Sequence, residues 1–238
     1  NNPRTATHPS TEEPVPSSPH TDGVQAAPLP AGESQRLAAL HQYRLLDTLP
    51  EAVYDDLAFI ASQICQTPIA LVSLIDEHRQ WFKAKIGLEA TETPRDIAFC
   101  AHAILDPSAV MQVPDTRLDE RFARNPLVTS APGIRFYAGV PLRTSDGFNL
   151  GTLCVIDKEP RPIDQEQIDD LTDLASLVVD QLELRLAASV VLLVGERFGG
   201  TFEPTKRHDQ LIGQSIPGLE AASDGIAHQE NLVATVVG

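Results

Sequence analysis

The sequence GIRFYAGVPLRTSDGFNLGTLCVID occupies residues 133–157 and predicts a β-hairpin. Its first arm alternates strictly, and one face carries Ile134, Phe136, Ala138, Val140 and Leu142. Alternation of this kind is typical of a strand that buries one face. The segment 144–147, TSDG, supplies the turn before the second arm. Arg135 and Tyr137 fall on the other face, where a cation and a phenol could line a ligand pocket. The hairpin therefore suggests a sensor or binding domain.

The composition restricts the possible partners. The 238 residues are 42% hydrophobic, which is enough to bury a sizeable core. The net charge of −15 repels nucleic acid phosphates and anionic lipid head groups, so we expect neither nucleic acid nor a membrane as partner. The three widely spaced cysteines favour a reducing compartment, and with no apolar signal-peptide core we expect a cytoplasmic protein.

The pattern along the chain divides it into three parts. Residues 1–32 are rich in Pro, Ser, Thr and Ala and predict a disordered tail. Residues 33–188 carry the periodic segments and predict one folded domain. Residues 189–238 interrupt short apolar runs with Gly, Pro and His, and their order stays open.

Within the domain, the apolar spacing predicts α-helices, strands and a polar loop. Helices are expected from Glu33, over 52–66, over 96–105 and over 165–188, and strands over 69–75, 80–86 and 110–113. Asp164 is placed as the N-cap of the last helix, with Gln167 completing a capping box. The segment 114–132 is polar and rich in turn residues. This order predicts an α+β fold with an antiparallel sheet and helices on one face.

Six phrases in this order resemble the GAF domain of bacterial signalling proteins. They are RLLDTLPE (44–51), ALVSLIDEHRQWFKAKIGL (70–88), RDIAFCAHAIL (95–105), VPDTRLDERFARNPLV (113–128), GIRFYAGVPL (133–142) and GTLCVIDKEPRPI (151–163). The resemblance implies a six-stranded antiparallel sheet with the terminal helices packed behind it. It also implies a small-molecule pocket in front, beneath the 96–105 helix and the 113–132 loop.

The cysteines allow two interpretations. Cys100 and His102 do not meet on a helix, since residues two apart point in different directions. Core packing is therefore the favoured role of Cys100, and the alternative is a thiol in the pocket for redox or covalent tetrapyrrole sensing. Bilin-binding relatives usually attach through Cys followed by His, but Ala101 follows Cys100. The cysteine cluster of the methionine sulfoxide reductase branch is also missing from 113–132, so we predict no enzymatic activity.

The predicted 96–105 helix, the polar loop and the hairpin hold the candidate ligand-binding residues. These are Cys100, Asp115, Arg121, Phe122, Asn125, Arg135 and Tyr137. Aromatic walls with a few polar groups suit a small-molecule site, and arginine binds carboxylate or phosphate. The alternatives are a solvated loop with ion pairs from Asp119 or Glu120 to Arg124, and core packing for the two aromatics. The signature of cyclic-nucleotide-binding relatives matches only in part, at Asp164 and Glu166.

The sequence thus predicts a non-catalytic sensory module that binds an unidentified small molecule and signals through its terminal helices. The resemblance implies a histidine kinase or nucleotide cyclase as effector, although no effector motif is present, so the chain is expected to be a fragment or a stand-alone regulator. The spread of apolar residues on the last helix predicts a homodimer through 33–46 and 165–188. A ligand-free dimerisation module stays open as an alternative.

Overall fold

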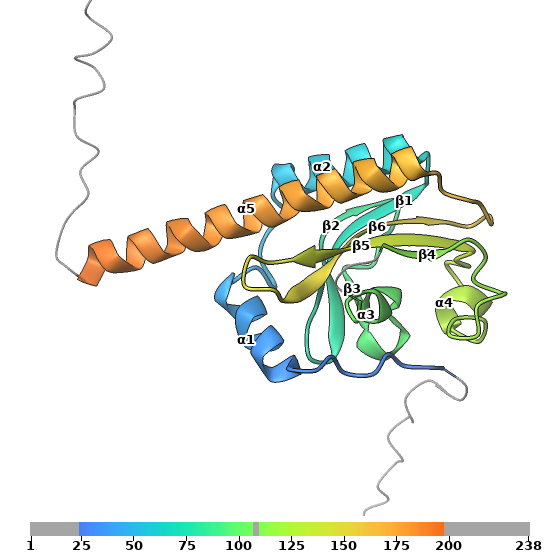
Figure 1. The fold of residues 1–238 in the computed structure, drawn as a ribbon, viewed down its shortest axis with the longest axis horizontal. Coiled ribbons are helices and arrows are strands. Elements are labelled where there is room, and N and C mark those ends of the chain that lie inside the picture. The colour runs from blue at the N-terminus through green and yellow to red at the C-terminus, as the bar shows by residue number, and fades with distance from the viewer. Residues whose placement is uncertain (1–23, 107–109, 198–238) are drawn as a thin grey trace, which may run out of the picture. The chain divides into compact units, whose positions relative to one another are not determined.

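The computed structural model describes residues 24–106 and 110–197 and is built around a six-stranded antiparallel sheet (Figure 1). The elements are α1 (Glu33–Gln42), α2 (Ala52–Cys65), β1 (Ile69–Ile75), β2 (Arg79–Ile86), β3 (Glu92–Pro94), a 3₁₀ turn (Arg95–Ile97), α3 (Phe99–Ala103), β4 (Met111–Val113), α4 (Pro126–Thr129), β5 (Phe136–Arg143), β6 (Asn149–Asp157) and α5 (Gln165–Arg197). The strand order is β3-β2-β1-β6-β5-β4. The predicted α+β fold is therefore confirmed. The sheet belongs to a compact unit that extends to Ala188.

Helices α2 and α5 cover one face of the sheet (Figure 1). The apolar stripe predicted for α5 is buried there, and it consists of Leu171, Leu174, Ala175, Val178 and Leu182. Burial of one such leucine or valine contributes about 1.5–3 kcal/mol. The predicted capping box is present: the Gln167 amide donates to Asp164 Oδ1 at 2.9 Å, and the Asp164 amide donates to Gln167 Oε1 at 3.3 Å. Apolar periodicity and capping thus fix where α5 begins and which face it buries.

A second apolar core lies on the opposite face, under α3 and α4 (Figure 1). It contains Tyr137 of β5 and Cys154 of β6, whereas Phe136 and Val155 face the helices α2 and α5. Both faces of the hairpin are consequently buried, not one as the alternation suggests. Ile134 also differs from the prediction: it precedes β5 and packs in the core under α3, not with Phe136.

The segment between β2 and β4 departs from the single helix predicted over 96–105. A 3₁₀ turn ends at Ile97, Ala98 is extended with φ −78° and ψ 123°, and α3 begins at Phe99. The Asn125 amide donates to Ile97 O at 2.9 Å, so this carbonyl is bound from outside the helix. The sequence pattern predicts neither β3, which lies in a segment without apolar alternation, nor α4, which lies within the polar segment 114–132.

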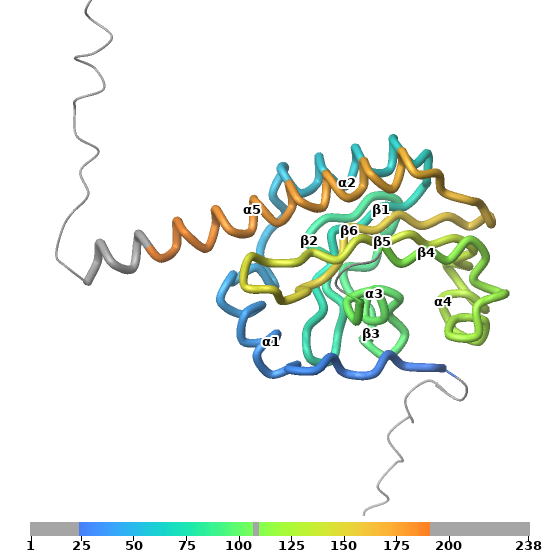
Figure 2. The backbone as a smooth tube through the Cα atoms, viewed as in Figure 1, coloured from blue at the N-terminus to red at the C-terminus, as the bar shows by residue number. Residues whose placement is uncertain are grey.

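Part of the segment predicted to be a disordered tail is packed. Residues 24–32 pass alongside α3 (Figure 2), where His102 Nε2 lies 3.1 Å from Gln25 O and Ala27 contacts the core. Residues 1–23 and 198–238 lie outside the described part of the chain. The structure therefore corrects the prediction for 24–32 alone.

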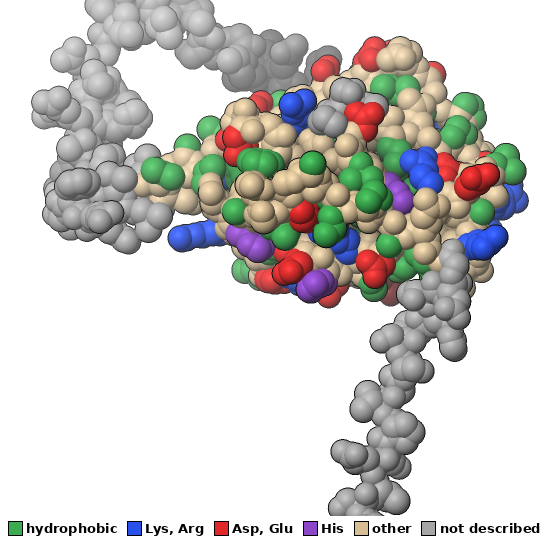
Figure 3. Space-filling model, turned by 60° about the horizontal axis from the view of Figure 1, so that its bottom comes forward, with side chains coloured by type: hydrophobic (Ala, Val, Ile, Leu, Met, Phe, Trp, Pro, Cys, Tyr) green, Lys and Arg blue, Asp and Glu red, His purple; other side chains and the backbone are tan. Residues whose placement is uncertain are grey.

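The surface near α1 carries charges of both signs. In Figure 3, acidic, basic and histidine side chains are scattered among apolar and other side chains on the visible face. Within the described residues, no helix has the length and apolar character needed to span a bilayer.

Candidate functional site

The candidate site is a cavity of about 200 Å³ on the α3 face of the sheet. Strands β1, β2, β5 and β6 form its floor, and α3 with the 127–134 segment closes it from the other side. Its walls are mostly apolar and include Leu71, Phe82, Phe99 and Ile156. A larger hollow of about 520 Å³ between β5 and α5 is more open to solvent, so the smaller and less open cavity is the better candidate site.

Two polar side chains stand at the β2–β3 end of this cavity. Gln80 and Thr93 face each other across the two strands and both line the cavity. Gln80 is only 5% exposed. Among the described residues, neither Gln80 Oε1 nor Thr93 Oγ1 has a hydrogen-bond partner. Buried polar atoms are normally paired, so these two oxygens mark the polar end of an otherwise apolar cavity.

A thiol pair and a phenol meet at the floor of the cavity. Cys100 Sγ lies 3.8 Å from Cys154 Sγ and accepts a hydrogen bond from the Tyr137 hydroxyl at 3.3 Å. A Cβ placed on Gly139 would lie 2.1 Å from that hydroxyl oxygen, so the glycine makes room for the tyrosine along the strand. Cys100 is 1% exposed and lines the cavity together with Tyr137.

Burial and hydrogen bonding separate the acidities of the two thiols. Burial opposes ionisation of Cys100, but hydrogen bonds from Cys154, Ser73, Thr152 and Tyr137 outweigh it and lower the pKa of Cys100. The pKa of Cys154 is raised well above its usual range by its hydrogen bond to Cys100 and by burial. The hydrogen bonds around Cys100 therefore favour its thiolate form.

Phe122 belongs to an aromatic cluster over α3. Its ring stacks on Phe99 with centroids 4.0 Å apart, and His102 meets it edge-on at 4.9 Å. Phe122 is fully buried. Burial lowers the pKa of His102, which favours the neutral imidazole. These contacts support core packing for Phe122. The phenylalanine of this cluster that lines the cavity is Phe99.

The charged candidates do not converge on the cavity. Asp115 pairs with Arg117 at 2.7 Å. Arg121 pairs with Asp119 at 2.6 Å, so the ion pairs expected from Asp119 or Glu120 to Arg124 are replaced by this one. In both pairs the aspartate also accepts the arginine's backbone N–H, which explains the Asp-x-Arg spacing.

Asn125 and Arg135 are held by backbone carbonyls. The Asn125 side chain accepts the Leu127 amide at the start of α4 and donates to Ile97 O. Arg135 Nη1 donates to Val128 O at 2.8 Å. Of the predicted site residues, the structure thus places Cys100 and Tyr137 at the cavity. The sequence does not indicate Gln80 and Thr93 as site residues. They come together only through the pairing of β2 with β3, a strand that the sequence pattern does not predict.

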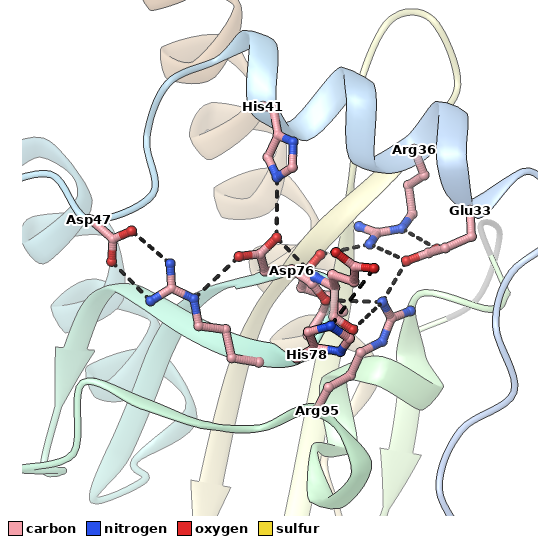
Figure 4. A network of polar contacts seen from close by, with 10 residues as sticks. Glu33, Arg36, His41, Asp47, Asp76, His78 and Arg95 are labelled. Carbon is pink, nitrogen blue, oxygen red and sulfur yellow. Dashed lines mark hydrogen bonds and ion pairs between the residues drawn. The ribbon is translucent and has the colours of Figure 1, made fainter.

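A polar network joins α1 to the β1–β2 turn (Figure 4). Glu33 binds Arg36 at 2.7 Å and also Arg95, and both arginines are almost fully buried. Arg36 also donates to Ile75 O at 2.7 Å, and Arg95 donates to Asp76 O at 3.0 Å. These contacts tie the first helix to the sheet.

A second network joins β2 to α5. Lys83 Nζ donates to Glu51 Oε1 at 2.6 Å, and Glu51 also pairs with Arg185 of α5 at 2.7 Å. Lys83 is the extra residue of a β-bulge, because Ser73 pairs with Phe82 and Val72 pairs with Ala84. A strand that lines the cavity is thereby connected to the long helix.

The chain is similar in sequence to part of a longer curated protein. The chain is 40% identical over 199 residues to a cyclic di-GMP phosphodiesterase of Pseudomonas aeruginosa; the match covers 83% of this chain and 32% of that protein. The chain therefore spans about a third of this relative's length.

Solved structures of GAF domains are similar at low identity. The second GAF domain of DevS from Mycobacterium smegmatis is 20% identical, with a TM-score of 0.44, over 60% of this chain and 97% of that one. The blue-light absorbing form of the PixJ GAF domain from Thermosynechococcus elongatus is 18% identical, with a TM-score of 0.46, over 60% of this chain and 90% of that one. The model of the GAF domain family matches residues 49–182. The chain therefore belongs to the GAF domain family.

Proposed function

We propose that this chain is the sensory, non-catalytic part of a signalling protein. It would bind a small molecule in the α3-side cavity and transmit the change through α5 to an effector. The observation that carries the proposal is the double role of β2. Gln80 and Phe82 of this strand line the cavity, and the next residue, Lys83, contacts Glu51, which holds Arg185 of α5.

A bound ligand would favour one arrangement of β2 and so bias the contact with α5, as differential binding to two states requires. The effector would belong to the class of the Pseudomonas relative, a cyclic di-GMP phosphodiesterase, or to the kinases and cyclases that the family resemblance implies. Within the described residues, no group of three or more His, Cys, Asp or Glu side chains is placed to bind a metal ion.

Binding is tested by mass spectrometry of molecules that co-purify with the chain, together with a thermal-shift screen. The screen should contain neutral aromatics, cyclic nucleotides and carboxylates. A true ligand at 100 times its Kd adds about 2.7 kcal/mol to the stability. The sensory proposal fails if nothing co-purifies and no class raises the Tm.

The transmission step is tested by amide hydrogen exchange with and without the ligand so identified. We expect slower exchange around Arg185 in the wild type, and loss of this response, with binding retained, in Lys83→Met. A response confined to the cavity in the wild type would contradict the role of β2.

We also propose a homodimer through α5, with α1 contributing. Leu177 and Leu184 lie seven residues apart on α5 and are 49% and 63% exposed, so they form an apolar stripe outside the core. Light scattering of Leu177→Lys/Leu184→Lys should show monomers, whereas Thr172→Lys, an exposed position on another face of the same helix, should leave the dimer intact. A monomeric wild type would contradict the dimer.

A redox sensor is a second candidate function, favoured by the 3.8 Å distance between the Cys100 and Cys154 sulfurs. A peroxide would oxidise the Cys100 thiol to a sulfenic acid and leave as water or alcohol. The Cys154 thiol would then attack this sulfur, forming a disulfide and releasing water.

Tetrapyrrole sensing is less favoured, because about 200 Å³ is below the roughly 300–1,000 Å³ of pockets for drug-sized ligands.

Intact-mass analysis after peroxide treatment tests the redox function. Disulfide formation removes two hydrogens in the wild type and in Cys65→Ser, while Cys154→Ser should stop at the sulfenic acid. A wild-type mass that peroxide leaves unchanged contradicts redox sensing.

A further inference from the structure

The size of the cavity sets the size of its ligand. Its volume is about 200 Å³. An apolar protein cavity of about 150 Å³ accommodates benzene, so this one fits a single aromatic ring with one or two further groups. Phe82 and Phe99 supply aromatic walls for such a ring. A dinucleotide or a tetrapyrrole would need a much larger space.

The charge of the lining restricts the ligand further. Within the described residues, no Asp, Glu, Lys, Arg or His side chain lines the cavity. The arginines of the neighbouring loop are engaged elsewhere: Arg121 by Asp119, and Arg135 by Val128 O. An anion in this cavity would lose its hydration without gaining a counter-charge. A neutral ligand is therefore favoured over a phosphate or a carboxylate.

The two unpaired oxygens add one polar requirement. Gln80 Oε1 and Thr93 Oγ1 lack partners in the described structure and stand at the same end of the cavity. The terminal torsion angle of a glutamine side chain has a broad distribution, so the Gln80 amide can rotate toward a ligand at a small free-energy cost. The Thr93 hydroxyl can donate or accept. A ligand that carries a hydroxyl or an N–H at this end would satisfy groups that the protein alone leaves unpaired.

We propose that the cavity binds a small neutral aromatic molecule with one hydrogen-bonding group directed at Gln80 and Thr93, of which phenol is the simplest probe. The inference rests on the proposed small-molecule function and names its ligand class. The ring would lie between Phe82 and Phe99, and the hydroxyl would meet the β2–β3 pair.

The test compares phenol with toluene, which has the same size but no hydroxyl. The two are titrated into the ¹⁵N-labelled chain, and amide shifts of cavity residues such as Leu71 and Ile156 report binding. We expect phenol to shift these amides in the wild type. In Gln80→Leu, the ratio of phenol to toluene affinity should fall about tenfold, which is the effect of one lost hydrogen bond. Gln112→Leu, the same substitution on strand β4 outside the cavity lining, should leave the ratio unchanged.

The outcomes separate the ligand class from the wider proposal. A ratio that Gln80→Leu does not change overturns the assigned polar contact. Cavity shifts with guanosine 3′,5′-cyclic monophosphate, and none with phenol, overturn the neutral class while the sensory function stands. Shifts with no probe, together with a screen in which no compound stabilises the chain, remove both.

Discussion

The buried ammonium of Lys83 allows a sharp prediction about stability. Its side chain is 1% exposed, and Nζ donates to Glu51 Oε1 at 2.6 Å, to Leu49 O at 2.8 Å and to Thr48 Oγ1 at 2.9 Å. Removing one partner of a buried ion pair costs about 3–5 kcal/mol, because the other charge stays buried. The Glu51 side chain is 37% exposed and two neutral oxygens remain. We therefore expect Glu51→Gln to cost about 1–3 kcal/mol.

The opposite substitution should be far milder. Lys83→Met keeps an unbranched stem beside the Tyr54 ring and removes the charge that needs a partner. Glu51 keeps Arg185 and access to water. We expect a change within about 1 kcal/mol of zero, and the double variant should recover most of the loss caused by Glu51→Gln.

Urea unfolding at pH 7 measures these differences. Trp81 is the single tryptophan of the chain, is 8% exposed and lies two residues from Lys83, so its fluorescence reports on β2. Glu89→Gln, at an exposed loop position, is the matched control and should change little. The reasoning is refuted if Lys83→Met is as destabilising as Glu51→Gln, or if the double variant shows simple additivity.

Three further changes test the rest of the structure. The pKa of Glu33 is lowered: burial opposes ionisation, but hydrogen bonds to two arginines prevail. Its contribution to stability is thus present above pH 4.5 and lost as the pH falls through its lower folded pKa; Glu33→Gln should flatten the acid limb of a stability–pH curve, and an unchanged limb would contradict this. Gly151→Ala should cost about 3 kcal/mol in urea unfolding, because the new Cβ would lie 1.8 Å from Ser73 O, and a neutral result would disprove the close approach. Asn125→Ala removes a helix cap and a second hydrogen bond and should cost about 2 kcal/mol by the same assay; a cost near zero would count against its structural role.

Local periodicity made most of the fold predictable. The hairpin of β5 and β6 and the buried stripe of α5 follow from spacings within one segment. The residues of the candidate site are less predictable from the sequence, since Gln80 and Thr93 meet only through the pairing of β2 with the three-residue strand β3. Arg121 is a candidate site residue by its sequence, but in the structure its backbone N–H and its guanidinium both bind Asp119 within a local turn. The periodicity of apolar residues does not indicate such a turn.

The sheet divides the domain into two cores that evolution can change separately. Residues such as Leu71 and Ile156 belong to the core on the cavity side, whereas Val72 and Val155 belong to the core beneath α5. Under the proposed function, substitutions in the first set would change which molecule is recognised without repacking α5, the helix proposed to transmit the response. The bulge at Lys83 is an exception. Lys83 follows the cavity-lining Phe82 in the chain, yet its side chain pairs with Glu51 on the opposite side of the sheet, where α5 packs. Among relatives with different ligands, we expect variation to concentrate on the cavity face and to spare this position.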